Sequence, residues 1–235
     1  MHQLERPESG NLLLNALPDG EACHLTDKME RVPLSAKEIL HVPHGPIGSV
    51  HFVESGIIAI LVVLENGSCA EVGVVGREGL IGLPLVLGAQ SSPNEAMVLT
   101  AGTALRIGFA DFQIELQRRP ALMRLMLQYL RTFYAQVSQT AACNGHHTLE
   151  QRLARWLLLA HDRSDGDDLD LTQEFLSMML CVHRPAVSIA AGNLQRLGIV
   201  EYRRGRIRIL DRDELETVSC ECYHAVQGQV ARLFV

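Results

Sequence analysis

The sequence predicts an α+β fold: an N-terminal antiparallel β-barrel of the jelly-roll type, a long helix, and a C-terminal winged helix-turn-helix. Three observations support this fold class. Short apolar segments alternate with Gly, Pro, Asn and Ser from Arg31 to Ala110, which is typical of antiparallel β-structure. A helical apolar stripe follows from Leu122 to Val137. Between Leu171 and Leu210, two short helical patterns are followed by a hairpin pattern.

Length and composition allow one large or two medium domains. The 235 residues are 47% hydrophobic and 20% charged, which excludes a disordered chain. The longest apolar run, Ile57–Leu64, is too short for a bilayer span of about 20 residues, and Met1–Gly10 does not resemble a secretory signal. We therefore expect a cytoplasmic protein without membrane contact. We place the domain boundaries at residues 1–117, 118–145 and 146–235.

Two kinds of element are expected before residue 118. The first 30 residues look helical and partly loop, with a leucine-rich piece at Leu12–Leu17. Brief strands are then expected at 49–53, 57–64, 70–75, 96–99 and 104–109. Glycines recur between Gly73 and Gly88, which indicates tight corners or close backbone approach.

A long helix is expected from Arg119-Pro120 to about Asn144-Gly145, with proline tolerated in its first turn. Its apolar stripe, in steps of four, three, four and four, is made of Leu122, Met126, Tyr129, Phe133 and Val137. Such a helix is about 35 Å long, too long for one side of a small domain. We interpret the helix as a dimer-forming or inter-domain helix, with the stripe as the dimer seam; the alternative is a helix packed on its own barrel.

The segment after this helix has the pattern of a winged helix-turn-helix. A helix is expected at Leu149–His161, and Thr172 is a candidate N-cap for a short helix that ends near Leu180. Cys181–His183 forms the turn, and a second helix runs from Arg184 to Leu197. The strands of the wing follow, around a turn at Gly205, and the second one alternates Arg and Ile strictly.

The distribution of charge singles out this segment. The net charge of −6 argues against a general polyanion binder. Yet residues 171–212 hold seven arginines and three acidic residues, directly after five aspartates in 162–170. An arginine-rich wing beside a helix-turn-helix is suited to double-stranded DNA.

Individual side chains can be assigned to this interface. The residues expected to read bases are His183, Arg184, Ser188 and Ile189, with Arg184 the best candidate for a bidentate contact to guanine. The residues expected to contact phosphate are Thr172, Arg196, Arg203, Arg204 and Arg206. The alternative is a winged helix that contacts only other proteins.

The cysteines do not predict a metal site. None of the six forms a CxxC pair, and we expect reduced thiols. Cys220 and Cys222 with His224 are a weak metal signal on their own. We therefore expect no metal and no other cofactor.

Two stretches, Leu176–Val187 (LSMMLCVHRPAV) and Leu194–Val200 (LQRLGIV), resemble the Crp/Fnr family of bacterial transcription regulators. Gln151–Leu158 is similar to the helix that opens the DNA-binding domain of that family, and the glycine-rich strands resemble its cyclic-nucleotide-binding barrel. The resemblance implies a homodimer that binds an inverted repeat and has no enzymatic activity. RNA polymerase is then a further candidate partner.

The resemblance also shows where this chain departs from the family. Arg184 matches the usual base-contacting arginine, but Pro185 and Ile189 replace a glutamate and a second arginine, so the target site should differ. In the barrel, Gly82 matches a glycine of the cyclic-nucleotide site, while Leu83 replaces its glutamate. The Arg-Ser pair that holds the cyclic phosphate falls on Asn94-Glu95. We expect no binding of cyclic AMP or cyclic GMP, and an effector that is unknown or absent.

Other chemistries are less consistent with the sequence. Only Cys23 lies where the oxygen sensors of the family hold an iron–sulfur cluster, and His41, His44 and His51 are haem-ligand candidates by residue type alone. The same histidines with Glu54 suggest a cupin-type metal enzyme, but the HxH spacing is missing and no histidine lies between His51 and His146. A protein-interaction module that has lost DNA binding is the remaining alternative.

Overall fold

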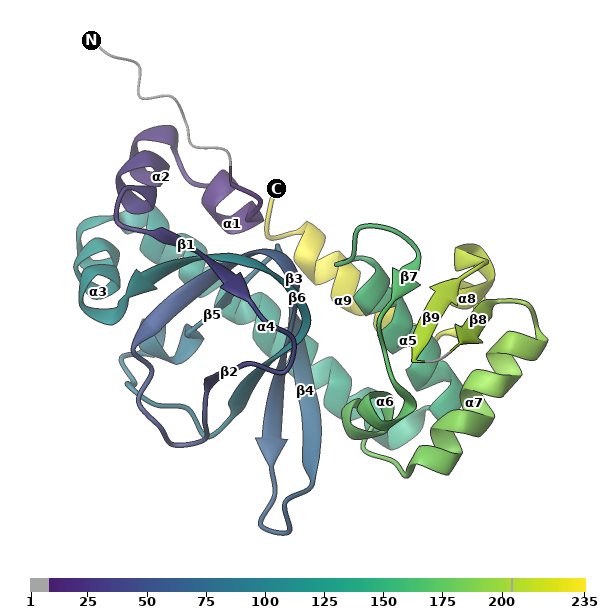
Figure 1. The fold of residues 1–235 in the computed structure, drawn as a ribbon. Helices are drawn as coiled ribbons and strands as arrows, with labels where there is room; N and C mark the ends of the chain where they lie inside the picture. The colour runs from purple at the N-terminus through teal and green to yellow at the C-terminus, as the bar shows by residue number, and fades with distance from the viewer. Residues whose placement is uncertain (1–8, 204) are drawn as a thin grey trace. The chain divides into compact units, whose positions relative to one another are not determined.

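The computed structural model describes residues 9–203 and 205–235 (Figure 1). Its elements are, in chain order, α1 Leu12–Asn15, α2 Asp19–Thr26, β1 Glu30–Leu34, β2 Ile39–His41, β3 Ser49–Val63, β4 Cys69–Val75, β5 Leu80–Ile81, the 3-10 helix η1 Leu83–Leu87, β6 Glu95–Gly108, α3 Phe109–Arg118, α4 Pro120–His146, α5 Leu149–His161, β7 Asp168–Leu169, α6 Gln173–Met179, α7 Arg184–Arg196, β8 Val200–Arg203, β9 Arg206–Ile209, α8 Arg212–Val218 and α9 Cys222–Ala231. The order confirms the predicted α+β class.

The chain forms two compact units. The first contains the described residues up to Ile60, Val75–Tyr134 and Leu233–Val235. The second contains Leu61–Val74 and Ala135–Arg232. The long helix α4 therefore contributes its first half to one unit and its second half to the other.

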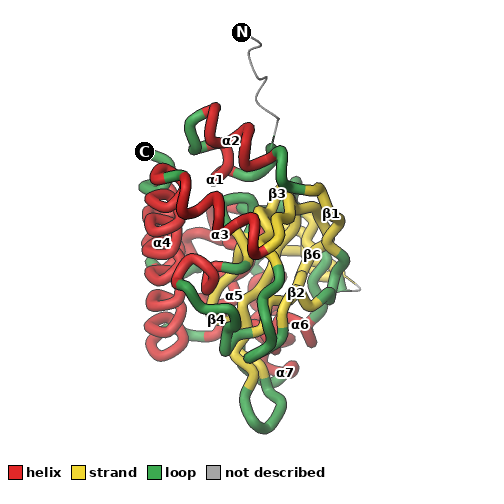
Figure 2. The backbone as a smooth tube through the Cα atoms, turned by 90° about the vertical axis from the view of Figure 1, so that its left-hand side faces the viewer, coloured by secondary structure: helices red, strands yellow, loops and turns green. Residues whose placement is uncertain are grey.

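The strands of the N-terminal part form one sheet, in which β1, β6, β3 and β4 follow one another (Figure 2). Strand β2 also pairs with β6, and β5 pairs with β3. The pairs β1–β6, β2–β6 and β3–β5 are antiparallel. Across the described residues the strand order ends at β1 on one side and β4 on the other. The predicted jelly-roll-like antiparallel domain is thus confirmed, with a sheet that does not close into a complete barrel.

Two glycines explain why the strands are longer than predicted. The expected strands 49–53 and 57–64 are one strand, β3, and 96–99 with 104–109 are one strand, β6. Gly56 has a positive φ of 86°, and a Cβ on it would lie 2.7 Å from the Thr100 carbonyl oxygen. A side chain on Gly102 would collide with the backbone of Ser55. Glycine at both positions lets the two long strands approach closely, whereas the sequence pattern alone suggested breaks.

The apolar stripe of α4 supplies the core of the first unit. Leu122, Met126 and Tyr129 are at most 3% exposed and belong to the same buried cluster as Phe52 and Phe112. They do not form the predicted dimer seam, because an amphipathic helix covers the nearest apolar core first. Phe133 is half-buried against this cluster, and Val137 is half-buried in the second unit.

The second unit contains the predicted winged helix-turn-helix together with elements that the pattern did not predict. Helix α5 begins with a capping box between Thr148 and Gln151. The hairpin β8–β9 is extended by β7, in which Asp168 pairs with Arg208, so the wing has three strands. Helices α8 and α9 complete the unit, and α5 packs against α7, α8 and α9.

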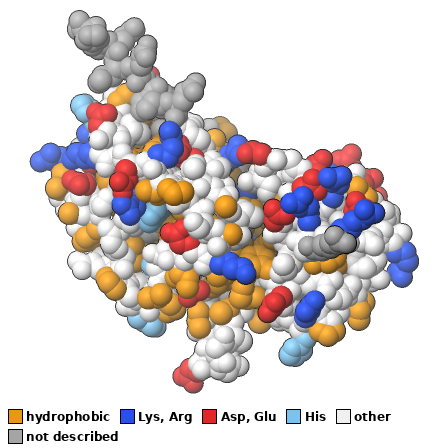
Figure 3. Space-filling model, in the orientation of Figure 1, with side chains coloured by type: hydrophobic (Ala, Val, Ile, Leu, Met, Phe, Trp, Pro, Cys, Tyr) orange, Lys and Arg blue, Asp and Glu red, His pale blue; other side chains and the backbone are white. Residues whose placement is uncertain are grey.

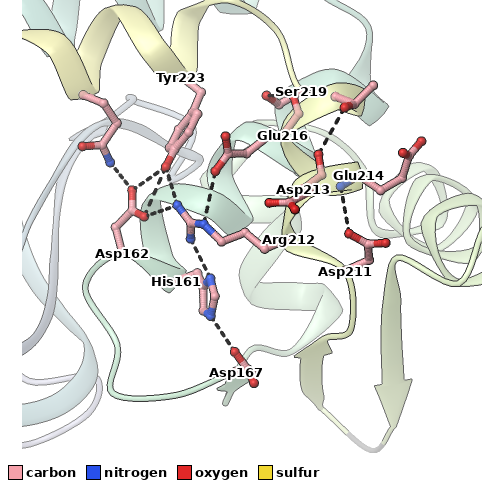
Figure 4. A network of polar contacts seen from close by, with 12 residues as sticks. His161, Asp162, Asp167, Asp211, Arg212, Asp213, Glu214, Glu216, Ser219 and Tyr223 are labelled. Carbon is pink, nitrogen blue, oxygen red and sulfur yellow. Dashed lines mark hydrogen bonds and ion pairs between the residues drawn. The ribbon is translucent and has the colours of Figure 1, made fainter.

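A polar network holds α9 in the second unit (Figure 4). The Arg212 guanidinium donates to His161 Nδ1 at 2.7 Å, to Asp162 Oδ1 at 2.7 Å and to the Tyr223 hydroxyl at 2.6 Å. Burial and the neighbouring Asp162 raise the pKa of Tyr223 to about 12, so the phenol stays a hydrogen-bond donor. The network links the end of α5 to the start of α8 and to α9.

Among the described residues, no single helix is long and apolar enough to cross a membrane. Helices α6 and α7 are long and apolar enough only when taken together, and they are bent by 106° relative to each other.

Candidate nucleic-acid interface

Helices α6 and α7 have the geometry of a helix-turn-helix, since their axes are bent by 106° at a short break. Thr172 caps α6, its Oγ1 accepting from the Phe175 N–H at 3.1 Å. Cys181 makes the turn with a positive φ of 53°. Pro185 lies in the first turn of α7, where no hydrogen bond is lost.

Buried contacts fix the orientation of α7. Val187, Ala190 and Leu194 are at most 4% exposed and form its inner face. On α6, the Phe175 ring packs edge-on against Trp156 of α5, with 6.3 Å between ring centroids. The inner face of α7 is therefore buried within the second unit, and its outer face is exposed and can contact a partner.

The outer face of α7 carries three of the four predicted base-reading residues. His183, Arg184 and Ile189 are exposed, and Ile189 is 68% exposed although it is apolar. In the part of the chain that the structure describes, the Arg184 guanidinium has no hydrogen-bond or ion-pair partner. It is thus available for a planar acceptor pair such as guanine O6 and N7.

Ser188, the fourth predicted residue, contacts its own motif. Its hydroxyl lies 2.7 Å from Gln173 Oε1 and 3.2 Å from the Arg184 carbonyl oxygen, and it is half-buried. A hydroxyl has only one hydrogen to donate. Donated to Gln173 Oε1, the nearer acceptor, this hydrogen links α7 to α6.

The side chains of Tyr202 and Gln195, which were not predicted as site residues, position the wing. The Tyr202 hydroxyl on β8 accepts from the Gln173 N–H at 3.0 Å. The Tyr202 N–H in turn donates to Gln195 Oε1 at 2.9 Å. These bonds fix β8 to both helices. The sequence does not reveal this role of Tyr202, because its hydrogen-bond partners lie on other elements.

The predicted phosphate contacts are largely engaged within the protein. Arg196 is exposed and donates to Asn193 Oδ1 at 3.1 Å, and Arg204 lies outside the described residues. Three wing arginines form exposed ion pairs with N–O distances of 2.7 to 2.8 Å: Arg203 with Glu201, Arg206 with Asp170, and Arg208 with Asp168. The hydrogen bond from Arg208 holds the pKa of Asp168 below its usual value.

The charge of the whole segment that holds the helix-turn-helix and the wing is closely balanced. From Asp162 to Arg212 the chain holds eight arginines and eight acidic residues. Figure 3 shows basic and acidic side chains interleaved over the region of β7 to β9. The excess of positive charge counted from Leu171 onward is offset by the aspartates of the adjacent strand β7 and its flanks.

Four residues of the first unit are assigned by the resemblance to a degenerate cyclic-nucleotide pocket: Gly82, Leu83, Asn94 and Glu95. Gly82 has a φ of 108° and starts η1, and Leu83 is 9% exposed and belongs to the buried core. Asn94 donates its backbone N–H to Ser92 Oγ at 3.0 Å, and Glu95 is half-buried at the start of β6. Leucine and glutamate thus stand where the resemblance assigns a ribose-binding carboxylate and a phosphate-binding pair.

The histidines named for cupin or haem chemistry do not gather with Glu54. His51 and Glu54 are three residues apart on β3, so their side chains leave opposite faces of the strand. Glu54 accepts from Arg31 Nε at 2.6 Å and from the Gly10 N–H at 3.2 Å. Burial alone would raise the pKa of Glu54, but these hydrogen bonds hold it below its usual value.

Comparisons with known proteins agree with this architecture. Family models match residues 151–218, as a Crp-like helix-turn-helix domain, and residues 31–119, as a cyclic nucleotide-binding domain. A comparison with curated proteins gave no significant match.

Similar solved structures share the fold at low sequence identity. FixK2 from Bradyrhizobium japonicum is 15% identical, with a TM-score of 0.71 over 82% of this chain and 98% of that one. The c-di-GMP-responsive global regulator CLP from Xanthomonas campestris is 16% identical, with a TM-score of 0.66 over 82% and 99%. A Crp/Fnr-family regulator from Thermus thermophilus is 21% identical, with a TM-score of 0.65 over 81% and 98%.

A cyclic-nucleotide-binding-type domain, a long helix and a helix-turn-helix in one chain define a transcription regulator and not an enzyme. The chain belongs to the Crp/Fnr family.

Proposed function

We propose that this regulator binds double-stranded DNA as a homodimer on an inverted repeat, with α7 of each copy in the major groove. The observation that carries the proposal is the outer face of α7, where Arg184 is exposed and, among the described residues, without a partner. Two such helices about 34 Å apart would contact half-sites one helical turn apart. DNA binding also implies a cytoplasmic protein, and RNA polymerase as a candidate partner.

The wing contacts phosphate in this proposal by exchanging partners. Exposed ion pairs contribute little to stability because solvent screens them, so a phosphate oxygen can replace Glu201 or Asp170 on Arg203 or Arg206. The balance of charges has a consequence for binding: fewer net counterions are released than the number of arginines suggests, and affinity falls less steeply with salt.

The second copy docks on the outer face of α4. Residues spaced by seven, Leu127 and Tyr134, are 50% and 71% exposed. Beside Leu127 lies a shallow apolar groove lined by Met123 and the stems of Arg124 and Arg131. This face, and not the buried stripe through Met126, is free to form a dimer seam.

The first unit has lost cyclic AMP and cyclic GMP as ligands. A carboxylate at Glu95 repels a cyclic phosphate, and no arginine lies between Arg77 and Arg106 to offset it. We expect millimolar cyclic AMP or cyclic GMP to leave the Tm of the protein unchanged in a thermal unfolding assay. A rise of several degrees with either nucleotide would contradict this assignment. The fold neighbour CLP makes c-di-GMP the third ligand to include.

Replacing Arg184 tests the DNA contact. Arg184→Ala should lower affinity for the preferred site by about 1–3 kcal/mol and relax base preference at one position per half-site. The control is Arg232→Ala, which removes another exposed arginine, just beyond α9. Specific and random duplexes are compared by fluorescence anisotropy at one salt concentration. If both variants retain the full ratio of specific to random binding, Arg184 does not read bases.

A further inference from the structure

Four metal-ligating side chains converge in the second unit, at a place that the proposed DNA contact does not use. Cys143 lies in the last turn of α4 and His147 directly follows that helix. Cys220 precedes α9, and Cys222 is its first residue. Their ligand atoms all lie within 4.8 Å of one another. The Cys143 and Cys220 sulfurs are 3.5 Å apart, as are Cys222 Sγ and His147 Nδ1.

The two separations of 3.5 Å match those between ligands around a single ion. Tetrahedral bonds of about 2.0 to 2.3 Å place sulfur and nitrogen ligands roughly 3.5 to 3.8 Å apart. The local backbone supports this arrangement. His147 N–H donates to the Cys143 carbonyl at 3.1 Å, which continues the helical turn and sets these two side chains on one face.

The surroundings resemble the outer shell of a metal site. Glu221 Oε2 lies 3.2 Å from His147 Nε2, so a proton on Nε2 leaves Nδ1 free to ligate. Gln139 Nε2 donates to Cys222 Sγ at 3.0 Å. An exposed glutamate holding the outer nitrogen of a histidine, whose inner nitrogen faces a thiol, is the carboxylate–histidine pair of metal centres.

Burial and charge are also suited to a cation. The three cysteines are at most 3% exposed and form a cluster of their own, apart from the large apolar clusters. Buried Arg155 is an electrostatic neighbour of Cys143, and its Nη2 donates to Thr140 Oγ1 at 3.0 Å. Three thiolates around a divalent cation leave one negative charge, which this guanidinium offsets.

We propose that Cys143, His147, Cys220 and Cys222 bind one Zn²⁺ ion in a closed tetrahedral site that fastens α9 to the end of α4. Three sulfurs and one nitrogen are a donor set typical of structural zinc. The ligand thiols release their protons to solvent as the Zn–S bonds form. With four protein ligands no position stays open for a substrate, so the site stabilises the fold.

This proposal replaces the expectation of a protein without metal. That expectation weighed Cys220 and Cys222 with His224, which is exposed and lies outside the cluster. Cys143 is 77 residues from Cys220, and no local spacing reveals the pair.

Elemental analysis of the purified protein, prepared without added metal or chelator, tests the site. We expect about one zinc per chain in the wild type and less than a tenth of that in Cys222→Ser and His147→Ala. Two matched controls should keep full zinc: Cys23→Ser, a buried cysteine elsewhere, and His224→Ala, a neighbour of Cys222 outside the cluster. Equal loss of zinc in the controls and the ligand variants would overturn the proposal.

Further measurements separate ligation from folding. Apoprotein titrated with Co²⁺ should develop the visible bands of tetrahedral thiolate-bound cobalt, and Zn²⁺ should abolish them. His147→Cys should retain metal because sulfur replaces the nitrogen ligand. Glu221→Gln should keep the stoichiometry with about 10–100-fold weaker affinity. Wild-type protein without zinc and without a cobalt spectrum, or with a Cys143–Cys220 disulfide in its intact mass, would contradict the site.

Discussion

Arg184 and Ser188 lie one helical turn apart on α7, but their side chains are in different environments. Arg184 projects outward with no partner among the described residues, while the Ser188 hydroxyl is held between α6 and its own helix. Both were predicted to read bases, since each is polar and lies near the start of the helix. Periodicity indicates which face a residue is on, but a hydrogen bond to Gln173 on another helix is visible only in the fold.

His51 makes the first unit sensitive to acid. It is 9% exposed on β3, and in the described part of the chain its Nδ1 is buried without a hydrogen-bond partner. Burial, with a smaller contribution from Arg106, lowers its pKa to about 4. The unfolded chain takes up this proton near pH 6.5, so stability falls as the pH drops from about 6.5 to about 4, by up to about 3 kcal/mol.

Replacing His51→Leu should remove this acid-sensitive loss and leave stability at pH 7 unchanged or higher. His24→Leu, at an exposed position on α2, is the control and should keep the wild-type profile. Urea denaturation at pH 7, 5.5 and 4.5 measures the difference. Burial lowers the pKa of His41 in the same way, so some acid sensitivity should remain. Parallel curves for the wild type and His51→Leu would disprove the assignment.

At the scale of elements, α7 presents a glycine on its outer face. Gly192 is exposed, and a Cβ added there would meet nothing within 4 Å. Glycine inside a helix costs about 1 kcal/mol relative to alanine. Its presence on this face is understandable if DNA approaches the backbone closely.

Gly192→Ala should therefore stabilise the protein by about 0.5–1 kcal/mol and weaken DNA binding. Gly228→Ala on α9 is the matched control, because its Cβ also meets no neighbour within 4 Å. It should stabilise the protein equally and leave affinity unchanged. Thermal unfolding and anisotropy titrations on the same preparations measure both effects. Unchanged affinity in Gly192→Ala would place DNA away from this part of α7.

The elements themselves show how far the sequence predicts the fold. The start of α4 at Pro120, the turn at Cys181 and the wing follow from local signals: a proline, a break in periodicity and an alternating strand. The sequence did not predict that the apolar stripe of α4 packs in the core of the first unit, because a period of 3.6 identifies the apolar face of a helix and not what covers it. The ion pairs of the wing were missed for the same reason, since Asp168 and Asp170 reach Arg208 and Arg206 only across the sheet.

At the scale of the whole molecule, the regulator combines a net charge of −6 with nearly balanced charge along the segment from Asp162 to Arg212, which holds most of the proposed DNA contacts. Long-range attraction to DNA is then weak, and site choice depends more on contacts in the groove than on the backbone. In the proposed function, specificity also requires two copies, since one recognition helix contacts only a few bases. The exposed face of α4 therefore matters as much as α7 for the proposed function.

Selection of bound DNA from random duplexes, by purified protein without added ligand, tests the central proposal most directly. We expect an inverted repeat with half-sites one helical turn apart, about 34 Å. Leu127→Glu, which places a charge on the exposed face of α4, should lose the repeat. Recovery of no enriched sequence by the wild type at low salt, or of an unpaired half-site, would contradict a dimeric DNA-binding regulator that needs no ligand.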